Sequence, residues 1–354
     1  MKKLLFYQSI TFAFIFSVLF IVFVFGSMEQ TMFSKEKGQR VSTNHTFKHI
    51  ADNVQTEDVG EQRRAAIIRE PIRIVFAGDL MMSGSIVHTV ETHGVDYPFH
   101  YVRDEIKEAD YAVVNLETAV TTRGESFAYD KQFTFKMPPH YLEGIKNAGF
   151  DMVSLANNHT MDYREEGLID TINYLKEYEI DYIGAGENKT EAYKAHFVDI
   201  KGKKVAFLGF SRVLPTGTWY AQENKPGIAS GYQLDRMERI IKKTKKKADY
   251  VLVYIHWGIE RQQTPEQYQV NKGKAMIDAG ADAIIGAHPH VLQPIEEYKG
   301  KPIAYSLGNF LFPDYVSGPT AETGLLTLVL DGDEVGYEWR EYVITNDQIH
   351  PVGE

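Results

Sequence analysis

Short apolar runs along this chain repeatedly end in polar, chemically active side chains. The first run, Ile72–Ala77, is rich in β-branched residues and leads into Gly78-Asp79, which indicates a buried strand that places a carboxylate at its end. The same pattern predicts strands at Tyr111–Val114, Met152–Leu155, Tyr250–Ile255, Ala283–Ile285 and Ile303–Tyr305. We therefore expect polar groups to gather at the ends of neighbouring strands.

Helical patterns separate several of these predicted strands. They cover Glu165–Tyr178, Gln233–Lys247 and Glu266–Ala279. Near the C-terminal end, Gly324–Leu330 and Gly336–Ile344 have the pattern of strands with no helix between them. This mixture predicts an α/β fold of two mixed sheets packed face to face with helices outside, rather than one purely parallel sheet.

The N-terminal segment has a different pattern, because Leu4–Phe25 is almost wholly apolar on every face and follows two lysines. Its length is enough for a helix to cross the hydrocarbon core of a membrane, and the lysines favour a cytoplasmic N-terminus. A cleaved signal peptide is the alternative, because Gly26 and Ser27 are small. We expect a single-pass anchor in the cell membrane, with the C-terminal domain extracytoplasmic.

Three regions follow from these patterns. Residues 1–26 form the predicted transmembrane anchor, and residues 27–70 are polar and aperiodic, which indicates a stalk or linker. Residues 71–354 form the predicted folded domain. Within it, the lysine-rich stretch Lys242–Lys247 fits a solvated helix end better than a binding patch, because cations favour helix C-termini.

The amino-acid composition limits which partners and which reactive side chains this chain can use. The chain of 354 residues is 44% hydrophobic, carries a formal net charge of −10 and contains no cysteine. The negative charge gives no electrostatic reason to expect a nucleic acid partner. The absence of cysteine excludes disulfides, thiol nucleophiles, thiolate metal ligands and a lipoprotein anchor. Any metal ligands must therefore be His, Asp, Glu or Asn side chains.

The polar groups at the strand ends form a plausible ligand set for a metal. They are Asp79, Glu117, Asn158, His159, His256, His288 and His290. Carboxylate, amide oxygen and imidazole together suit Mn, Zn or Fe, and a bridging carboxylate can hold two such ions close together. We predict that the six residues other than His159 converge as ligands on one cleft. His159 is expected at its rim as the general acid.

Two local motifs carry most of this prediction. In His288-Pro289-His290, an extended segment would turn side chains two positions apart toward one cleft, and the proline would keep the segment extended. In Asn158-His159, the amide can ligate a metal while the imidazole reaches the substrate, although asparagine is also common in turns. Asp162, which follows, is expected to cap a helix rather than to bind metal.

Six ordered motifs resemble the CapA-type poly-γ-glutamate capsule-synthesis family, also called PgsA. The motifs, which span roughly Ile72–Leu330, are Gly78-Asp79-Leu80-Met81-Met82, Asn115-Leu116-Glu117, Ala156-Asn157-Asn158-His159, His256-Trp257-Gly258 with Glu260, Gly286-Ala287-His288-Pro289-His290 and Tyr305-Ser306-Leu307-Gly308-Asn309-Phe310. That family is similar in turn to calcineurin-like metallophosphoesterases. The resemblance therefore implies an α/β/β/α sandwich with one or two divalent metals.

The resemblance also implies residue roles. Asp79 matches the first metal aspartate, and Glu117 matches the bridging carboxylate. The Asn158-His159 pair matches the family's Asn-His pair, His256 matches a lone metal histidine, and His288 with His290 matches the terminal histidine pair. The phosphoesterase pattern has histidine where this chain has Met81, a poor ligand for hard ions. The expected partners are poly-γ-glutamate or a related anionic polymer and the membrane synthase subunits.

Two functional hypotheses remain at this point. The first is a component of capsule synthesis and export that retains a metal-dependent hydrolase site. The second is a non-catalytic accessory protein that binds the polymer or the membrane synthase, which the methionine at position 81 favours.

Overall fold

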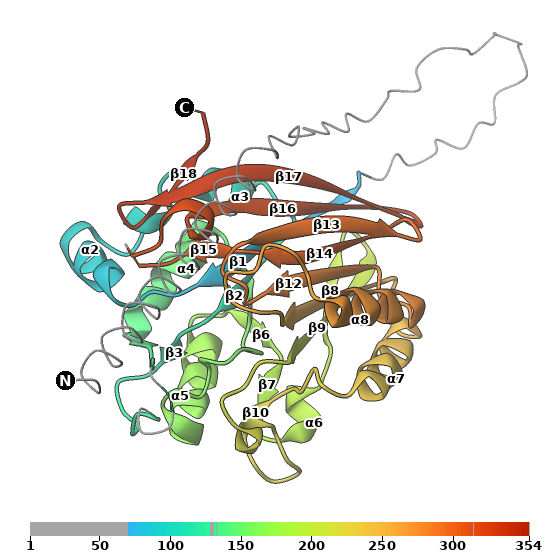
Figure 1. The fold of residues 1–354 in the computed structure, drawn as a ribbon, viewed down its shortest axis with the longest axis horizontal. Helices are drawn as coiled ribbons and strands as arrows, with labels where there is room; N and C mark the ends of the chain where they lie inside the picture. Colours follow the sequence, from blue (N-terminus) through green and yellow to red (C-terminus); the bar gives the residue numbers. More distant parts are fainter. Residues whose placement is uncertain (1–69, 128–130, 132, 314, 354) are drawn as a thin grey trace, which may run out of the picture. The chain divides into compact units, whose positions relative to one another are not determined.

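Two β-sheets stand face to face at the centre of the fold, as the hydrophobic pattern predicts, and helices cover their outer sides (Figure 1). The computed structural model describes residues 70–127, 131, 133–313 and 315–353, all within one unit of the chain, Ile67–Glu354. The predicted anchor and nearly all of the predicted stalk lie outside the described residues. Within the described ranges, no helix is both long and apolar enough to cross a membrane.

The first sheet has β1 at its centre, parallel to β2 and β15 and antiparallel to β16. Its strand order is β18-β17-β16-β1-β2-β5-β6, with β15 also paired to β1. The bounds are β1 Ile72–Leu80, β2 Tyr111–Leu116, β5 Met152–Ser154, β6 Asp181–Ile183, β15 Asn309–Leu311, β16 Glu322–Asp331, β17 Glu334–Thr345 and β18 Gln348–Pro351.

The second sheet has the order β13-β14-β12-β11-β9-β8 and is also mixed. Its bounds are β8 His196–Ile200, β9 Lys203–Ser211, β11 Tyr250–His256, β12 Ala283–Ala287, β13 Leu292–Tyr298 and β14 Lys301–Leu307. Two small sheets pair β3 (Ala119–Val120) with β4 (Lys136–Met137) and β7 (Ala185–Gly186) with β10 (Gly227–Ile228).

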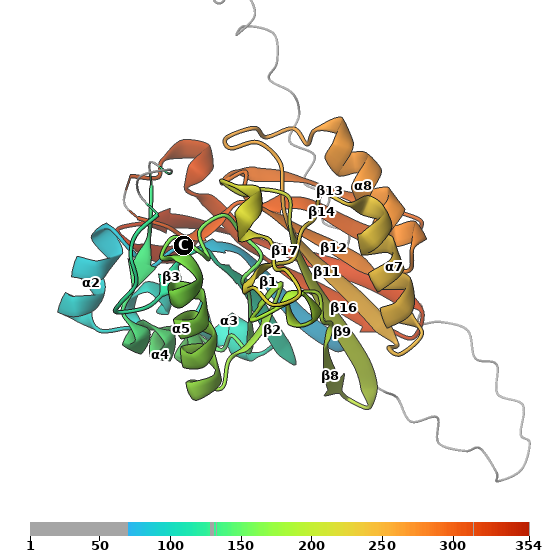
Figure 2. The same ribbon diagram turned by 90° about the horizontal axis from the view of Figure 1, so that it is seen from below.

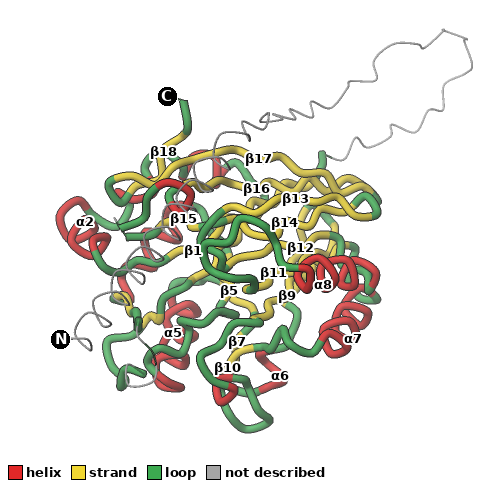
Figure 3. The backbone as a smooth tube through the Cα atoms, viewed as in Figure 1, coloured by secondary structure: helices red, strands yellow, loops and turns green. Residues whose placement is uncertain are grey.

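Helices lie on the outer side of each sheet, so that strands form the interior (Figures 2 and 3). The α-helices are α2 Ser85–His93, α3 Arg103–Lys107, α4 Leu142–Ala148, α5 Arg164–Glu177, α6 Lys189–Ala192, α7 Leu234–Lys245 and α8 Gln267–Asp278. Short 3-10 turns are η1 Tyr97–Phe99, η2 Pro139–Tyr141, η3 Gly217–Trp219 and η4 Gly318–Thr320.

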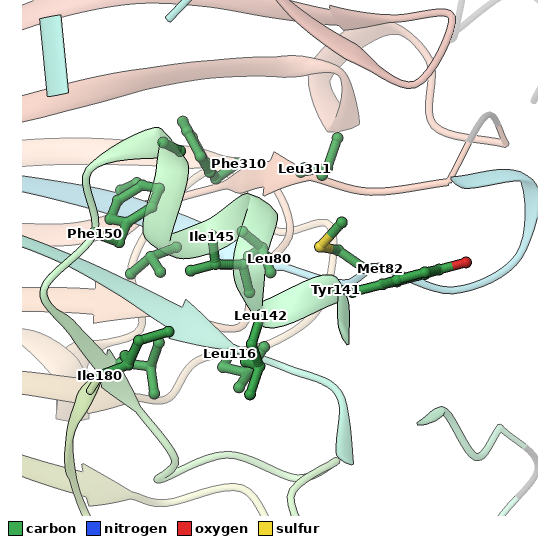
Figure 4. Close-up of a cluster of buried hydrophobic side chains, with 14 of the residues drawn as sticks. Leu80, Met82, Leu116, Tyr141, Leu142, Ile145, Phe150, Ile180, Phe310 and Leu311 are labelled. Atoms are coloured by element: carbon green, nitrogen blue, oxygen red, sulfur yellow. The ribbon is translucent and has the colours of Figure 1, made fainter. Parts of the chain in front are cut away.

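Three large apolar clusters hold these layers together. One packs the first sheet against its helices, and Figure 4 shows Leu80 and Leu116 of the strands beside Leu142 and Ile145 of α4. A second lies between the two sheets, and a third packs the second sheet against α7 and α8. Successive side chains of a strand point to opposite faces of its sheet, so one strand contributes apolar side chains to two clusters. The central strands are therefore buried on both faces. The result is a four-layer α/β/β/α arrangement.

The predicted elements agree with the structure to within a few residues. Predicted helices Glu165–Tyr178, Gln233–Lys247 and Glu266–Ala279 correspond to α5, α7 and α8. The sequence pattern missed the helices α2, α3, α4 and α6, the antiparallel hairpin β8–β9, and strands that include β6, β13 and β18. The mostly half-exposed pattern of β13, with charged residues in its second half, explains why periodicity alone did not reveal it.

Close backbone contact explains the glycine before Asp79. A Cβ on Gly78 would lie 2.1 Å from the carbonyl oxygen of Gly308, so a side chain cannot fit there. The Asp79 N–H donates to that same carbonyl at 2.9 Å, which ties the end of β1 to the turn before β15. This contact fixes the backbone that presents the Asp79 carboxylate.

Candidate metal centre

The candidate ligands meet where strand ends of the two sheets face each other. Asp79 lies near the end of β1, Glu117 follows β2, and Asn158 follows β5, all in the first sheet. From the second sheet, His256 is the last residue of β11, and His288 and His290 follow β12. One sheet therefore contributes the oxygen ligands and the other contributes the imidazoles.

Short distances join these groups into one cluster. His256 Nε2 lies 2.7 Å from Asn158 Oδ1 and 3.5 Å from Glu117 Oε1. His290 Nδ1 lies 3.3 Å from Asp79 Oδ2, and its Nε2 lies 4.0 Å from Glu117 Oε1. The six candidate ligands therefore lie close together in a buried cluster, and their role as metal ligands stays a prediction.

Glu117 is the shared member of two possible ligand sets. The ligand atoms of Glu117, His288 and His290 all lie within 4.8 Å of one another, and so do those of Asp79, Glu117 and His256. Both carboxylate oxygens of Glu117 are buried without a hydrogen-bond partner, and so is Nδ1 of His288. Burying a carboxylate without a partner costs free energy. A divalent cation bound by these unpaired oxygen and nitrogen atoms would offset that cost.

Burial and mutual charges shift the pKa values of several groups in this cluster. Burial and the neighbouring Asp79 raise the pKa of Glu117 well above its usual range. Burial and the neighbouring imidazoles hold the pKa of His256 far below 6.5 and lower that of His288 to about 3. Burial opposes protonation of His290, but Glu117 and Asp79 outweigh it and raise the pKa of His290 to about 9. The two carboxylates thus raise the pKa of one imidazole, while burial lowers the pKa values of the other two.

The backbone of the histidine pair differs from the extended segment that the sequence suggested. His288 and His290 both have positive φ, 99° and 56°, so the segment after β12 is a left-handed bend. The prediction of an extended segment held by Pro289 was therefore wrong. Such backbone is unfavourable for residues other than glycine, and it is found at sites where the surrounding structure imposes it. Here the His288 N–H donates to Asp79 Oδ2 at 3.1 Å.

His159 lies beside the candidate ligands and is held by a carboxylate. Its Nε2 is 4.0 Å from Glu117 Oε1, while Nδ1 is 2.7 Å from Asp162 Oδ2. Since an ionised carboxylate can only accept, a proton on Nδ1 is donated to Asp162 and the other ring nitrogen faces the cluster. The expectation that Asp162 caps a helix was wrong, because Tyr163 is the N-cap residue of α5. Asp162 instead accepts from the Phe135 N–H.

Sequence reasoning missed Lys131, which completes this group. Its ammonium lies 2.6 Å from Asp162 Oδ1, 2.8 Å from His159 Nδ1 and 2.6 Å from the carbonyl oxygen of Asn158. No local motif marks this lysine, since its partners are about thirty positions away. It neutralises Asp162 and ties the loop before β4 to the Asn158-His159 motif.

Amides that the motifs contained, but to which the sequence assigned no role, also position the ligands. Asn115 Nδ2 donates to Asp79 Oδ1 at 2.7 Å, and Asn157 Nδ2 donates to Asn115 Oδ1 at 3.1 Å. Asn309 Oδ1 lies 2.9 Å from His290 Nδ1. Hydrogen bonds of this kind fix the orientation of groups that bind metal.

Met81 lies in an apolar cluster beside the centre. It is 1% exposed and packs with Phe312, Ala321 and Ile344, with Phe135 against them. The ring of Phe312 lies 5.0 Å from that of His290, and the ring of Phe135 lies 4.7 Å from that of His159. Met81 thus packs in the cluster whose aromatic rings contact two of the site imidazoles.

Comparison with known proteins gives the family. The model of the bacterial capsule synthesis protein PGA_cap matches residues 73–314. The chain belongs to this capsule synthesis family. The matched range contains all six candidate ligands and His159.

Two relatives in the capsule synthesis family are 37% identical to this chain. One is the capsule biosynthesis protein CapA of Bacillus anthracis, aligned over 69% of this chain and 60% of that protein. The other is the PGA biosynthesis protein CapA of Bacillus subtilis strain 168, aligned over 67% of this chain and 62% of that protein. The chain thus matches less than two thirds of the length of these relatives.

A solved structure is also similar in its arrangement. It is the calcineurin-like phosphoesterase YfkN from Bacillus subtilis, with a TM-score of 0.46 and 17% sequence identity, covering 79% of this chain and 93% of that one. In this member of the capsule synthesis family, the candidate metal centre is defined by the chain's own residues and the distances between them.

Proposed function

We propose that this chain is an extracytoplasmic, membrane-anchored component of poly-γ-glutamate capsule synthesis or export that carries a metal-dependent hydrolase site. One observation carries the hydrolase part of the proposal. Glu117 is fully buried, has no hydrogen-bond partner at either oxygen, and belongs to both possible ligand sets. Membership of the capsule synthesis family supports the polymer as the biological context.

In this proposal each group has a specific task. Asp79, Glu117, Asn158, His256, His288 and His290 would hold one or two ions of Mn, Zn or Fe. A divalent ion in such a site supplies Lewis-acid activation of the bond to be broken. His159 would act as general acid through Nε2, the ring nitrogen that faces Glu117. Because Nδ1 donates to Asp162, this task requires the imidazolium form, which burial disfavours by lowering the pKa of His159. Asp162 and Lys131 keep that ring in place.

Metal analysis of the full chain tests the proposal. Purified in detergent and reconstituted with Mn or Zn, the chain should retain one or two ions when measured by inductively coupled plasma mass spectrometry. Glu117→Gln should lower that number, because the shared carboxylate is lost. Glu177→Gln, an exposed position on α5, is the matched control and should leave the number unchanged. A wild-type chain that retains no metal would rule out the hydrolase site.

A non-catalytic accessory role is the second candidate, and the burial of Met81 in an apolar cluster favours it. Deletion of the gene, followed by weighing of cell-bound and released polymer, distinguishes the two. If the site is catalytic, expressing the Glu117→Gln chain in the deletion strain should not restore the wild-type ratio of cell-bound to released polymer. If the chain acts only by binding, a folded Glu117→Gln chain should restore it.

A further inference from the structure

Beyond the candidate metal centre, a pair of cations lies at the same edge of the second sheet. Arg212 follows directly after β9, and its N–H donates to the carbonyl oxygen of His256 at 2.8 Å. Ser211, the residue before it, is in register with His256. Since neighbouring strands lie about 4.8 Å apart, the backbone of Arg212 is one strand away from a candidate metal ligand.

Aromatic side chains frame the guanidinium of Arg212. Its central carbon lies 3.5 Å from the centre of the Tyr268 ring and 5.1 Å from the centre of the Tyr232 ring. Its Nε is buried and has no hydrogen-bond partner. Tyr232 is 50% exposed, so the aromatic frame opens to solvent. The two rings thus hold the guanidinium in one orientation beside a solvent-exposed tyrosine.

Lys272, on α8, supplies the second positive charge. Its ammonium donates to the carbonyl oxygens of Tyr232 at 2.9 Å and Gly231 at 3.4 Å. An ammonium has three N–H donors, so one remains. Lys272 and Arg212 are neighbours because both contact Tyr232, the first through its carbonyl oxygen and the second through its ring. Burial and Arg212 lower the pKa of Lys272.

Within the part of the chain that the structure describes, no acidic side chain neutralises this pair. Among the residues that the structure describes, no carboxylate forms an ion pair with Arg212 or Lys272. Glu266 lies near Tyr268, but its side chain caps α8 by accepting from the backbone of Gln269. Two neighbouring cations without an acidic partner are unusual in a chain of net charge −10.

We propose that Arg212 and Lys272, framed by Tyr232 and Tyr268, bind carboxylate groups of an anionic polymer chain that runs along this edge toward the candidate metal centre. The forked guanidinium matches a carboxylate through two parallel hydrogen bonds, and the exposed ring of Tyr232 offers a surface for the polymer's methylene groups. The inference rests on the polymer named in the proposed function and gives that polymer a binding surface.

Binding of fluorescently labelled poly-γ-glutamate to the full chain in detergent tests this, measured by anisotropy at low and physiological salt. The variant Arg212→Gln with Lys272→Gln should raise the dissociation constant at least about tenfold, because charge-assisted hydrogen bonds are lost. The matched control is Lys243→Gln with Lys246→Gln, which removes the same charge from exposed positions at the end of α7. That control should bind like the wild type.

Three outcomes would overturn the inference. The first is unchanged binding by the Arg212/Lys272 variant, and the second is an equal loss in the Lys243/Lys246 control, which would mean general attraction between charges. The third is displacement of the polymer by inorganic phosphate at concentrations where acetate has no effect, which would assign the pair to phosphate. If the double variant unfolds, Arg212→Lys keeps the charge without the fork and should still weaken binding.

The test separates this surface from the hydrolase site. The Arg212/Lys272 variant should retain the wild-type metal content, because neither residue is among the candidate ligands. If the wild-type chain binds the polymer through Arg212 and Lys272 but retains no metal, only the hydrolase proposal fails. If it retains metal but the Arg212/Lys272 variant binds the polymer as the wild type does, only the polymer surface fails.

Discussion

His159 is held by Asp162 on one side and faces Glu117 on the other, which is the arrangement that proton transfer requires. If it is the general acid, His159→Ala should lower turnover of a generic phosphodiester by about two to four orders of magnitude. Metal content should stay nearly the same, because the predicted ligands remain. Steady-state kinetics combined with metal analysis measures both. Wild-type turnover in the variant would remove His159 from the mechanism.

At position 81, the burial of the methionine makes packing the dominant role. A histidine there would place a polar ring among Phe312, Ala321 and Ile344, so Met81→His should lower the free energy of unfolding by about 1–3 kcal/mol. Urea denaturation measures this change, and Met81→Leu should have a small effect. A rise toward two bound ions per chain would instead show that the methionine occupies the place of a lost ligand.

Local patterns pointed to the candidate ligands because each lies at or within a few residues of the end of a strand, and their role as metal ligands stays a prediction. Lys131 could not be found in this way, because its role comes from contacts with residues about thirty positions away. Asn309 is likewise 19 positions from His290. Arg212 follows β9 and Lys272 lies on α8, so the two come together only in the folded chain. A short sequence pattern cannot reveal such a pair.

Among the elements, the outer strands β6 and β8 show how the two sheets are joined at one side. Asp181 of β6 lies 3.1 Å from Nε2 of His196 in β8 and accepts from the Tyr111 hydroxyl at 2.8 Å. His196 and Tyr111 lower the pKa of Asp181, while its burial opposes this. The contact therefore links the sheets through an ionised carboxylate.

Asp181→Asn tests this link through its pH dependence. A depressed carboxylate pKa stabilises the fold above the unfolded pKa of about 3.9, and that contribution is lost as the pH falls through the folded pKa. The variant should therefore be less stable at pH 7, by less than about 1 kcal/mol because the pair is half-exposed. Thermal unfolding should show the deficit shrinking toward pH 3. A deficit that is constant with pH would contradict the ionic link.

Strand and helix positions were predictable because burial produces clear periodicity, whereas details of connection were not. The hairpin β8–β9 begins with alternating half-exposed and exposed residues, which gives a weak apolar signal. At the bend of His288 and His290, the His288 N–H donates a hydrogen bond to Asp79 in the other sheet. A residue before proline usually has extended backbone, but His288, which makes this contact, has a positive φ instead.

For the whole molecule, the centre joins the two sheets, so metal should stabilise the entire fold. Chelation with EDTA should lower the midpoint of thermal unfolding, because Asp79 and Glu117 would then face each other buried without a cation. A ligand at 100 times its dissociation constant stabilises by about 2.7 kcal/mol. Scanning fluorimetry with and without added Mn or Zn measures the shift. Glu117→Gln should respond less, and an equal response in both chains would place the effect elsewhere.

The contact between Asp79 and the segment after β12 also has a consequence for biosynthesis. Asp79 contacts the backbone of His288, 209 positions later in the chain. The carboxylate therefore cannot meet its imidazole partners until most of the polypeptide has left the ribosome and, for a secreted domain, has crossed the membrane. Capture of the ion would follow translation, and the metal available in the final compartment would determine which ion the protein carries.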